Sequence, residues 1–169
     1  MLRLRPFKMS DATYLANWIQ DERSFNMWSA NKLKYPLSEE QIKGYKEMYE
    51  IDEFGWIFTA LNEKGTPVGH FLMRMADYKK ESVHFGFIIV DPSLRGKGYG
   101  VEMVSLGVHY AFEILKVRRV TLGVFDTNPA AEACYKKVGF VTETYNKGVF
   151  NYKDEKWGIF NMAIQREKS

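Results

Sequence analysis

The chain has 169 residues, long enough for one domain with a sizeable core, and its ordinary composition excludes a disordered or low-complexity protein. Its formal net charge is only +3 and its basic residues are scattered, which argues against nucleic-acid binding but suits a polyanionic cofactor. The single cysteine, Cys134, excludes an internal disulfide and a thiolate metal cluster and indicates a reducing, cytoplasmic location.

The chain begins with a short predicted strand over residues 2–5, followed by a helix. Ser10 can cap this helix, which presents Leu15 and Ile19 on one face and ends near Gln20.

The next two segments differ in pattern. Residues 21–36, DERSFNMWSANKLKYP, mix charges with aromatic rings without a clean period, which predicts a loop with at most a short turn. Ser38 and Gln41 then have the spacing of a capping box, so a second helix is expected to begin there.

Three strands are predicted in the middle of the chain. Residues 56–61 and 68–75 read as a hairpin around the turn NEKGTP, and residues 82–90 form the third strand. From Val101 the apolar residues recur at helical spacing, and residues 118–125 return to strand alternation.

The last helix opens at Asn128, which is followed by a proline, and two strands near residues 141–150 and 157–164 complete the chain. The predicted order is β-α-α-β-β-β-α-β-α-β-β. Because no repeat, linker or shift of composition divides the chain, residues 1–169 are expected to form one domain, a mixed sheet with helices on both faces.

The joint VDPSLRGKGYG, between a strand and a helix, contains three glycines. Gly96, Gly98 and Gly100 would leave backbone N–H groups accessible at a helix N-terminus, which attracts anions. Arg95 and Lys97 add positive charge at the rim of this loop. A bound phosphate or diphosphate would explain so much bare backbone.

Two familiar phosphate-binding patterns fit this loop poorly. A Rossmann fingerprint requires glycine where Val101 stands, and it opens its fold instead of following a later strand. A P-loop requires G-x-x-x-x-G-K-[ST], and no such string occurs in the chain.

The pattern Arg95-x-x-Gly98-x-Gly100 resembles the coenzyme A loop Q/R-x-x-G-x-G/A of the GNAT superfamily of N-acetyltransferases. A second stretch resembles the family's N-x-x-A-x-x-x-Y-x-x-x-G-F helix, and its matching residues are Asn128, Ala131, Tyr135, Gly139 and Phe140. The order of elements also matches. Within the superfamily, the chain is most similar to the branch of ribosomal-protein N-terminal acetyltransferases and their small-molecule relatives.

The resemblance implies a single-domain GNAT-like fold of the α/β (α+β) class, whose mixed, mostly antiparallel sheet splays apart at the cofactor cleft. It implies that acetyl-coenzyme A lies there, with its pyrophosphate on the glycine loop and its pantetheine arm along the strand before that loop. The cofactor-binding residues implied are Ile88, Ile89, Val90, Arg95, Gly96, Lys97, Gly98, Tyr99, Gly100, Asn128 and Tyr135.

By match to the family, Tyr135 is the expected proton donor to the departing thiolate, the alternative being an aromatic that fills the gap between helix and sheet. His84 stands where relatives carry a glutamate base, although a lone histidine in an apolar strand is more often structural. Cys134 is expected to be a small buried filler, so the amine would attack directly in a ternary complex. Neither His70 nor His109 has ligands spaced for a metal, and no metal is expected.

The function expected from the resemblance is transfer of the acetyl group to a primary amine, either a peptide N-terminus or a small molecule. Two other functions remain open: a non-catalytic acetyl-coenzyme A sensor of the same fold, and a nicotinamide-dependent oxidoreductase that uses the glycine loop. Aromatic candidates for the acceptor site are Trp28, Tyr35, Tyr145 and Trp157.

No nucleic-acid or membrane partner is expected. No apolar run approaches the ~20 residues that cross a bilayer, and the first residues become polar too early for a signal peptide. An exposed strand edge would support a homodimer.

Overall fold

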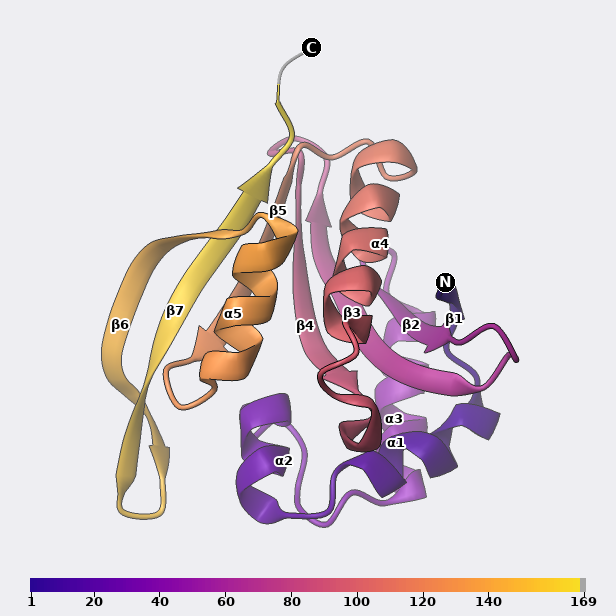
Figure 1. Ribbon diagram of the computed structural model, residues 1–169, viewed down its shortest axis with the longest axis vertical. Helices are drawn as coiled ribbons and strands as arrows, with labels where there is room; N and C mark the ends of the chain where they lie inside the picture. The colour runs from indigo at the N-terminus through magenta and orange to yellow at the C-terminus, as the bar shows by residue number, and fades with distance from the viewer. Residues whose placement is uncertain (168–169) are drawn as a thin grey trace.

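The computed structural model describes residues 1–167, so the last two residues of the predicted 1–169 domain lie outside the described part. One seven-stranded sheet, in the order β1-β2-β3-β4-β5-β7-β6, runs through the protein (Figure 1). Among the described strands, only β4 and β5 pair in parallel, and the other neighbours are antiparallel. The strands are β1 Arg3–Pro6, β2 Trp56–Leu61, β3 Pro67–Asp77, β4 Ser82–Val90, β5 Arg119–Phe125, β6 Val141–Tyr152 and β7 Glu155–Gln165.

Helices cover both faces of this sheet, as expected (Figure 1). The α-helices are α1 Ala12–Trp18, α2 Glu22–Ser29, α3 Glu39–Glu50, α4 Tyr99–Glu113 and α5 Pro129–Val138, and two 3₁₀ turns are η1 Met9–Asp11 and η2 Pro92–Leu94. The predicted mixed, mostly antiparallel α+β architecture is thereby confirmed. Within residues 1–167, no helix combines the length and the apolar character needed to span a membrane.

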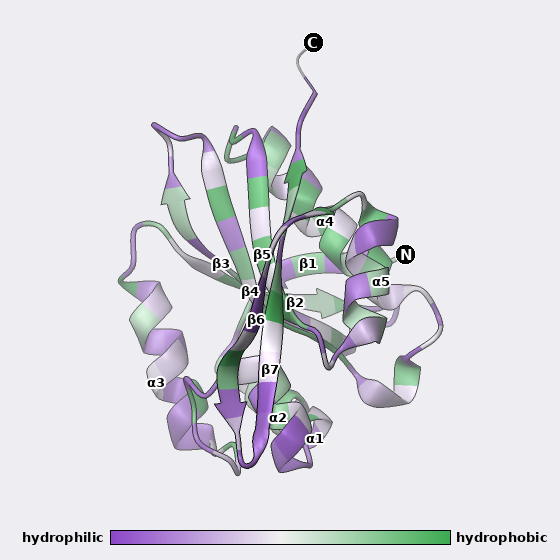
Figure 2. Ribbon diagram, turned by 90° about the vertical axis from the view of Figure 1, so that its left-hand side faces the viewer, coloured by the Kyte–Doolittle hydropathy of each residue, from purple (hydrophilic) through white to green (hydrophobic). Residues whose placement is uncertain are grey.

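The hydrophobic core has one large cluster on each side of the sheet. On the α4 and α5 side, Phe71, Phe85 and Met103 are essentially inaccessible to solvent. On the other side, α1, α2 and α3 bury Phe25 and Ile42 against the sheet. Hydrophobic and hydrophilic residues both appear along α3, which buries one face only (Figure 2).

The predicted loop at residues 21–36 was wrong in its first half, because α2 forms there. The side chain of Asp21 accepts a hydrogen bond of 2.8 Å from the Ser24 N–H, which caps the helix. Only Phe25 and Ser29 of α2 are buried. A helix of two turns with only two buried residues is too short to show a recognisable apolar periodicity in the sequence.

The helix expected to be capped by Ser10 also begins differently. Ser10 lies within η1, and Asp11 occupies the position before α1 without a capping bond from its side chain. The Asp11 carboxylate instead accepts hydrogen bonds of 2.7 Å from Arg5 and from the Thr59 hydroxyl. This partly buried ion pair anchors the start of α1 to β1 and β2.

The sheet opens between β4 and β5. Their pairing begins at Ser82 and ends where Phe85 lies beside Leu122. Beyond that point β4 stays paired with β3 alone and β5 with β7. The edge of β4 from Gly86 to Val90 therefore has no strand beside it, and the predicted splay of the sheet is confirmed.

Candidate active site

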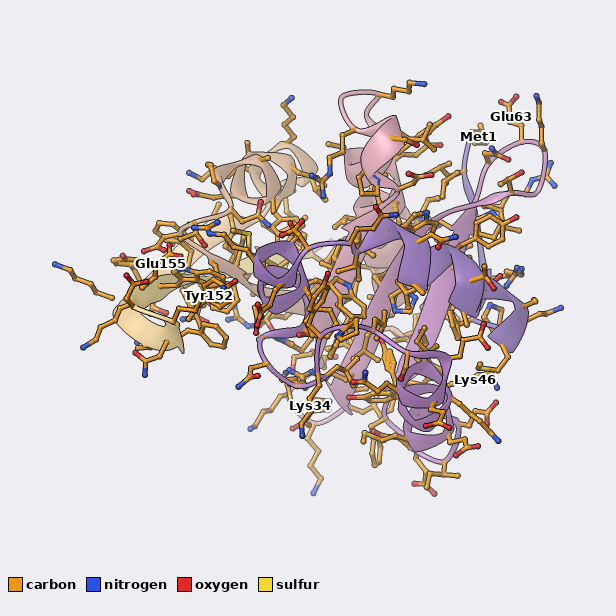
Figure 3. All side chains as sticks on the ribbon, turned by 90° about the horizontal axis from the view of Figure 1, so that it is seen from below. Met1, Lys34, Lys46, Glu63, Tyr152 and Glu155 are labelled. Carbon is orange, nitrogen blue, oxygen red and sulfur yellow. The ribbon has the colours of Figure 1, made fainter. Side chains whose placement is uncertain are left out.

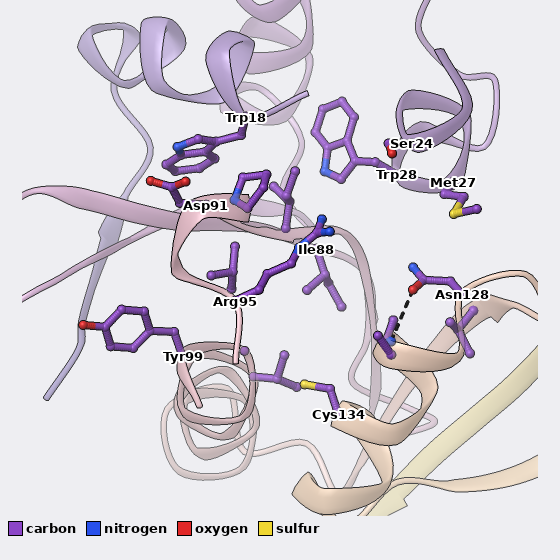
Figure 4. A pocket seen from close by; sticks show the side chains of 18 of the residues that line it. Trp18, Ser24, Met27, Trp28, Ile88, Asp91, Arg95, Tyr99, Asn128 and Cys134 are labelled. Carbon is purple, nitrogen blue, oxygen red and sulfur yellow. Dashed lines mark hydrogen bonds between the residues drawn. The ribbon is translucent and has the colours of Figure 1, made fainter. Parts of the chain in front are cut away.

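A cleft of about 820 Å³ fills the gap where β4 and β5 diverge. Its wall includes residues of β4, the end of β5, the loop before α4, the first turns of α4, one side of α5, and α2. Side chains from these elements, including Trp28, Arg95 and Asn128, surround one space (Figure 4). All the sequence-predicted cofactor residues line this cleft except Lys97.

The glycine loop presents bare backbone to the cleft. Gly96 and Gly98 have φ angles of 79° and 81°, which residues with a side chain rarely adopt. A Cβ added at either position would meet no atom within 4 Å, so both glycines border open space. Gly98 immediately precedes α4, whose first N–H groups have no partner within the helix. The loop therefore offers several backbone donors at the positive end of a helix.

Positive side chains lie around these donors. The Arg95 side chain extends into the space drawn in Figure 4, and Lys137 of α5 also lines the cleft. Lys97 is exposed and lies outside the lining. Asp91 lines the cleft as well, but its carboxylate accepts hydrogen bonds of 2.9 and 2.8 Å from the Ser93 N–H and hydroxyl.

The wall formed by β4 contains an irregularity. The register with β3 shifts between His70 and Leu72, and Phe87 has a φ of 50°. This bulge changes the alternation of side chains, so that Ile88 packs toward α4 while Phe87 and Ile89 pack toward the other face. The backbone beyond it, including Val90, remains unpaired on the β5 side.

Tyr135 of α5 lies in the cleft wall and is 7% exposed. Within residues 1–167, its hydroxyl has no hydrogen-bond partner. Burial, and then the neighbouring Cys134, raises the pKa of Tyr135. The phenol therefore stays protonated at neutral pH and is available as a hydrogen-bond donor.

Asn128, which precedes α5, and Cys134 of α5 also face the cleft. The Asn128 side-chain oxygen accepts a hydrogen bond of 3.3 Å from the Ala131 N–H, which leaves the amide nitrogen of Asn128 uncommitted (Figure 4). Cys134 is half-buried, packs against the core cluster as expected and also forms part of the cleft wall. Burial raises the pKa of its thiol, so the nucleophilic thiolate is disfavoured.

His84 does not line the cleft. Its Nδ1 lies 2.8 Å from the Thr121 hydroxyl. Burial, followed by the charges of Arg74 and Lys32, lowers the pKa of His84 to about 4. The imidazole is therefore neutral at pH 7.

The other histidines lie apart from the site. His70 is buried, with its Nε2 3.1 Å from the Tyr45 hydroxyl, and His109 is exposed on α4. No group of three or more His, Cys, Asp or Glu side chains within residues 1–167 is arranged to hold a metal ion.

Of the aromatic acceptor candidates, only Trp28 lines the cleft. Tyr35 donates a hydrogen bond of 2.8 Å to the Gln20 carbonyl, Tyr145 donates one of 2.7 Å to Asp126, and Trp157 is buried in a small core cluster. Because α2 was not expected, sequence reasoning missed the lining residues Ser24 and Met27, and it also missed Asn17 and Gln20 at the end of the preceding helix. The capping pattern at Asp21 was the only available signal.

A family model described as an acetyltransferase (GNAT) domain matches residues 1–141. The chain is 25% identical over 150 residues to an N-acetyltransferase 9-like protein of Caenorhabditis elegans, covering 81% of this chain and 73% of that protein. It is 35% identical over 97 residues to the holothin acyltransferase of a Pseudoalteromonas species, covering 57% of this chain but only 29% of that protein.

Among solved structures, a spermidine N-acetyltransferase from Vibrio cholerae, crystallised with CoA and spermine, superimposes with a TM-score of 0.84. The superposition covers 98% of this chain and 95% of that one at 22% sequence identity. At this level of identity, the likeness shows a shared fold.

Proposed function

The chain belongs to the GNAT acetyltransferase family, and we propose that it transfers the acetyl group of acetyl-coenzyme A to a primary amine. The observation that carries the proposal is the unpaired edge of β4, which leads directly into the glycine loop at the start of α4. We further propose that residues 1–169 form a single acetyltransferase domain and that the acceptor is a peptide N-terminus or a small amine.

The shape and charge of the loop fit a diphosphate. Gly96, Gly98 and Gly100 expose backbone donors, and Arg95 and Tyr99 stand beside them in the cleft wall. Lys97 would act from the rim through its charge. Asn128 would add its free amide N–H₂ from the opposite wall.

The unpaired edge of β4 fits an extended chain containing amides. Backbone groups at Ile88, Ile89 and Val90 would bind the pantetheine arm as a neighbouring strand would. Acetyl-coenzyme A, when bound, supplies an acetyl thioester. A β4 N–H beside the bulge would stabilise negative charge developing on its carbonyl oxygen.

Proton movements complete the scheme. As the amine nitrogen bonds to the acetyl carbon and the carbon–sulfur bond breaks, Tyr135 would donate its hydroxyl hydrogen bond, and then its proton, to the departing sulfur. His84 is the proposed base for the amine, acting through water because it lies outside the cleft lining. The raised pKa of Cys134 favours direct attack over an acyl-cysteine route.

One observation favours a second candidate function, a non-catalytic module that binds acetyl-coenzyme A. The pKa of His84, lowered to about 4, makes it a weak base. Binding of acetyl-coenzyme A without turnover of any peptide or small amine would support this alternative.

The test of the proposed function is release of the free thiol from acetyl-coenzyme A in the presence of a panel of amines and peptides. Tyr135→Phe keeps the ring in place but removes the proton donor. We expect kcat to fall by roughly 10²- to 10⁴-fold while acetyl-coenzyme A affinity stays nearly unchanged. An undiminished kcat would remove Tyr135 from the reaction.

A further inference from the structure

A group of cationic and polar side chains lies on the sheet face opposite α4 and α5. Arg74 on β3 and His84 on β4 are direct cross-strand partners, which places their side chains on one face. His84 contacts Thr121 of β5 through its Nδ1. Lys32, just after α2, brings its Nζ to 5.8 Å from the centroid of the Phe87 ring. We call Arg74, Lys32, His84 and Thr121 the basic cluster.

The cations of the basic cluster lack counter-ions. Within residues 1–167, no ion pair involves Arg74 or Lys32. The Arg74 Nε is buried without a hydrogen-bond partner. Burial, and then the charge of Arg74, lowers the pKa of Lys32. The Lys32 side chain reaches the surface, but the Arg74 Nε is buried. A buried guanidinium nitrogen without an acceptor is unfavourable, so this arrangement suits an anion supplied from outside the chain.

Other partly buried arginines of this protein do have partners. Arg5 binds Asp11 at 2.7 Å, and Arg119 binds the carboxylate of Glu143. Arg118, which is also half-buried without an ion pair, donates a hydrogen bond of 3.3 Å to the Arg166 carbonyl. Within residues 1–167, the absence of any side-chain partner therefore distinguishes Arg74 from these arginines.

The basic cluster borders the cleft. Gly86, which lines the cleft, follows His84 by two residues on the same strand, a spacing of about 7 Å. The Phe87 ring beneath Lys32 is also part of the cleft wall and packs against Trp28 with ring centroids 5.0 Å apart. The Trp28 Nε1 is buried without a partner. The cluster thus lies beside the bulged segment of β4, on the face away from α4 and α5.

We propose that the acceptor is a small amine bearing an anionic group, and that Arg74 and Lys32 bind this anion. The inference rests on the proposed function. Since the amine must reach the bulged segment of β4, the anion and the amino group would be separated by several bonds. Amino acids with a distal carboxylate, short peptides with a free C-terminus and aminoalkyl phosphates share this chemistry. A polyamine would bring further positive charge to the cluster and would be disfavoured.

The test compares matched acceptors that differ in charge. These are γ-aminobutyrate and its amide, glycylglycine and its amide, aminopropylphosphonate, and spermidine. We expect kcat/KM to favour the anionic member of at least one pair by on the order of tenfold or more, as for a charge-assisted hydrogen bond. The phosphonate arm distinguishes a phosphate site from a carboxylate site.

Variants assign the preference to the cluster. Arg74→Met and Lys32→Met should each bring the ratio of anionic to neutral kcat/KM close to one. The matched control is Lys34→Met, because Lys34 is an exposed lysine of the same segment (Figure 3). If Arg74→Met does not fold, Lys32→Met alone decides the point. Equal use of both members of every pair, a preference for spermidine, or an unchanged ratio in Lys32→Met would overturn the proposal.

A binding measurement separates this inference from the proposed function. NMR signals of the His84 ring should shift when γ-aminobutyrate, glycylglycine or aminopropylphosphonate is added to the coenzyme A complex, and should shift less with the amides. Failure of the protein to bind coenzyme A would contradict the proposed function. Intact coenzyme A binding with no His84 shift for any anion would contradict the anion site alone.

Discussion

Asn128 has two roles in this account. Its side-chain oxygen caps α5, and its amide nitrogen would contact acetyl-coenzyme A. The first role alone would explain an asparagine before proline in any fold, so a substitution that separates the two roles is needed.

Asn128→Asp makes that separation. The aspartate keeps the acceptor for the Ala131 N–H, so the free energy of unfolding should not fall. A negative charge facing the diphosphate should weaken acetyl-coenzyme A binding by roughly 1–4 kcal/mol. Isothermal titration measures this loss, and Asn128→Ala, which loses the cap at a cost of about 1 kcal/mol, is the control. Unchanged affinity in Asn128→Asp would leave Asn128 with the capping role alone.

His70 makes stability depend on pH. Burial, opposed by the charge of Asp11, lowers the pKa of His70 to about 3, whereas the unfolded chain has an ordinary value near ~6.5. Below pH 6.5 the unfolded state gains a proton that the folded state does not bind. The contribution of His70 to the free energy of unfolding should therefore fall by about 3 kcal/mol between pH 6.5 and pH 4.

Denaturant titrations of the wild type and His70→Gln at several pH values measure this effect. The variant should lose stability less steeply as the pH falls, whatever its stability at pH 7. Equal slopes in the two proteins would show that His70 is not the source.

At the residue scale, the sequence predicts best what a local motif encodes. Gly98, Gly100 and Tyr135 were found because fixed spacings place them at helix starts and on helix faces. Arg74 and Lys32 could not be found in this way. Their proximity depends on the pairing of β3 with β4 and on the packing of α2.

Among the elements, the one that the sequence did not reveal is α2. Its two turns bury only Phe25 and Ser29, so tertiary contacts and the Asp21 cap determine the helix more than its own period does. The β4 bulge at Phe87 was equally hidden, because an apolar run such as FIIV looks the same with or without a shift in register.

The loop before α4 can be tested as an element by comparing two glycines with the same backbone geometry. Gly98 and Gly65 both have φ of 81° and open space around a Cβ, but only Gly98 lies in the cleft wall. Gly98→Val and Gly65→Val should each cost about 1–2 kcal/mol of unfolding free energy. Only Gly98→Val should abolish acetyl-coenzyme A binding. Normal acetyl-coenzyme A binding by Gly98→Val, or an equal loss of binding in both variants, would contradict the proposal that the loop before α4 binds the diphosphate.

At the scale of the whole molecule, the strand sequence and the helices on both faces followed from period and punctuation. The parallel pairing of β4 with β5, and its end at Phe85 and Leu122, could not be read from local patterns. The family motifs predicted the splay because they carry information about the complete fold. The identity of the acceptor could not be predicted from the sequence, because the walls of the proposed acceptor site come from segments far apart in the chain.

The central claim is that the cleft between β4 and β5 binds acetyl-coenzyme A. The most direct test is a set of parallel thermal melts with acetyl-coenzyme A, coenzyme A and NAD, because a ligand at 100 times its Kd adds about 2.7 kcal/mol of stability. We predict that Tm rises with both acetyl-coenzyme A and coenzyme A and does not change with NAD. A shift with NAD alone, or with none of the three, would contradict the account.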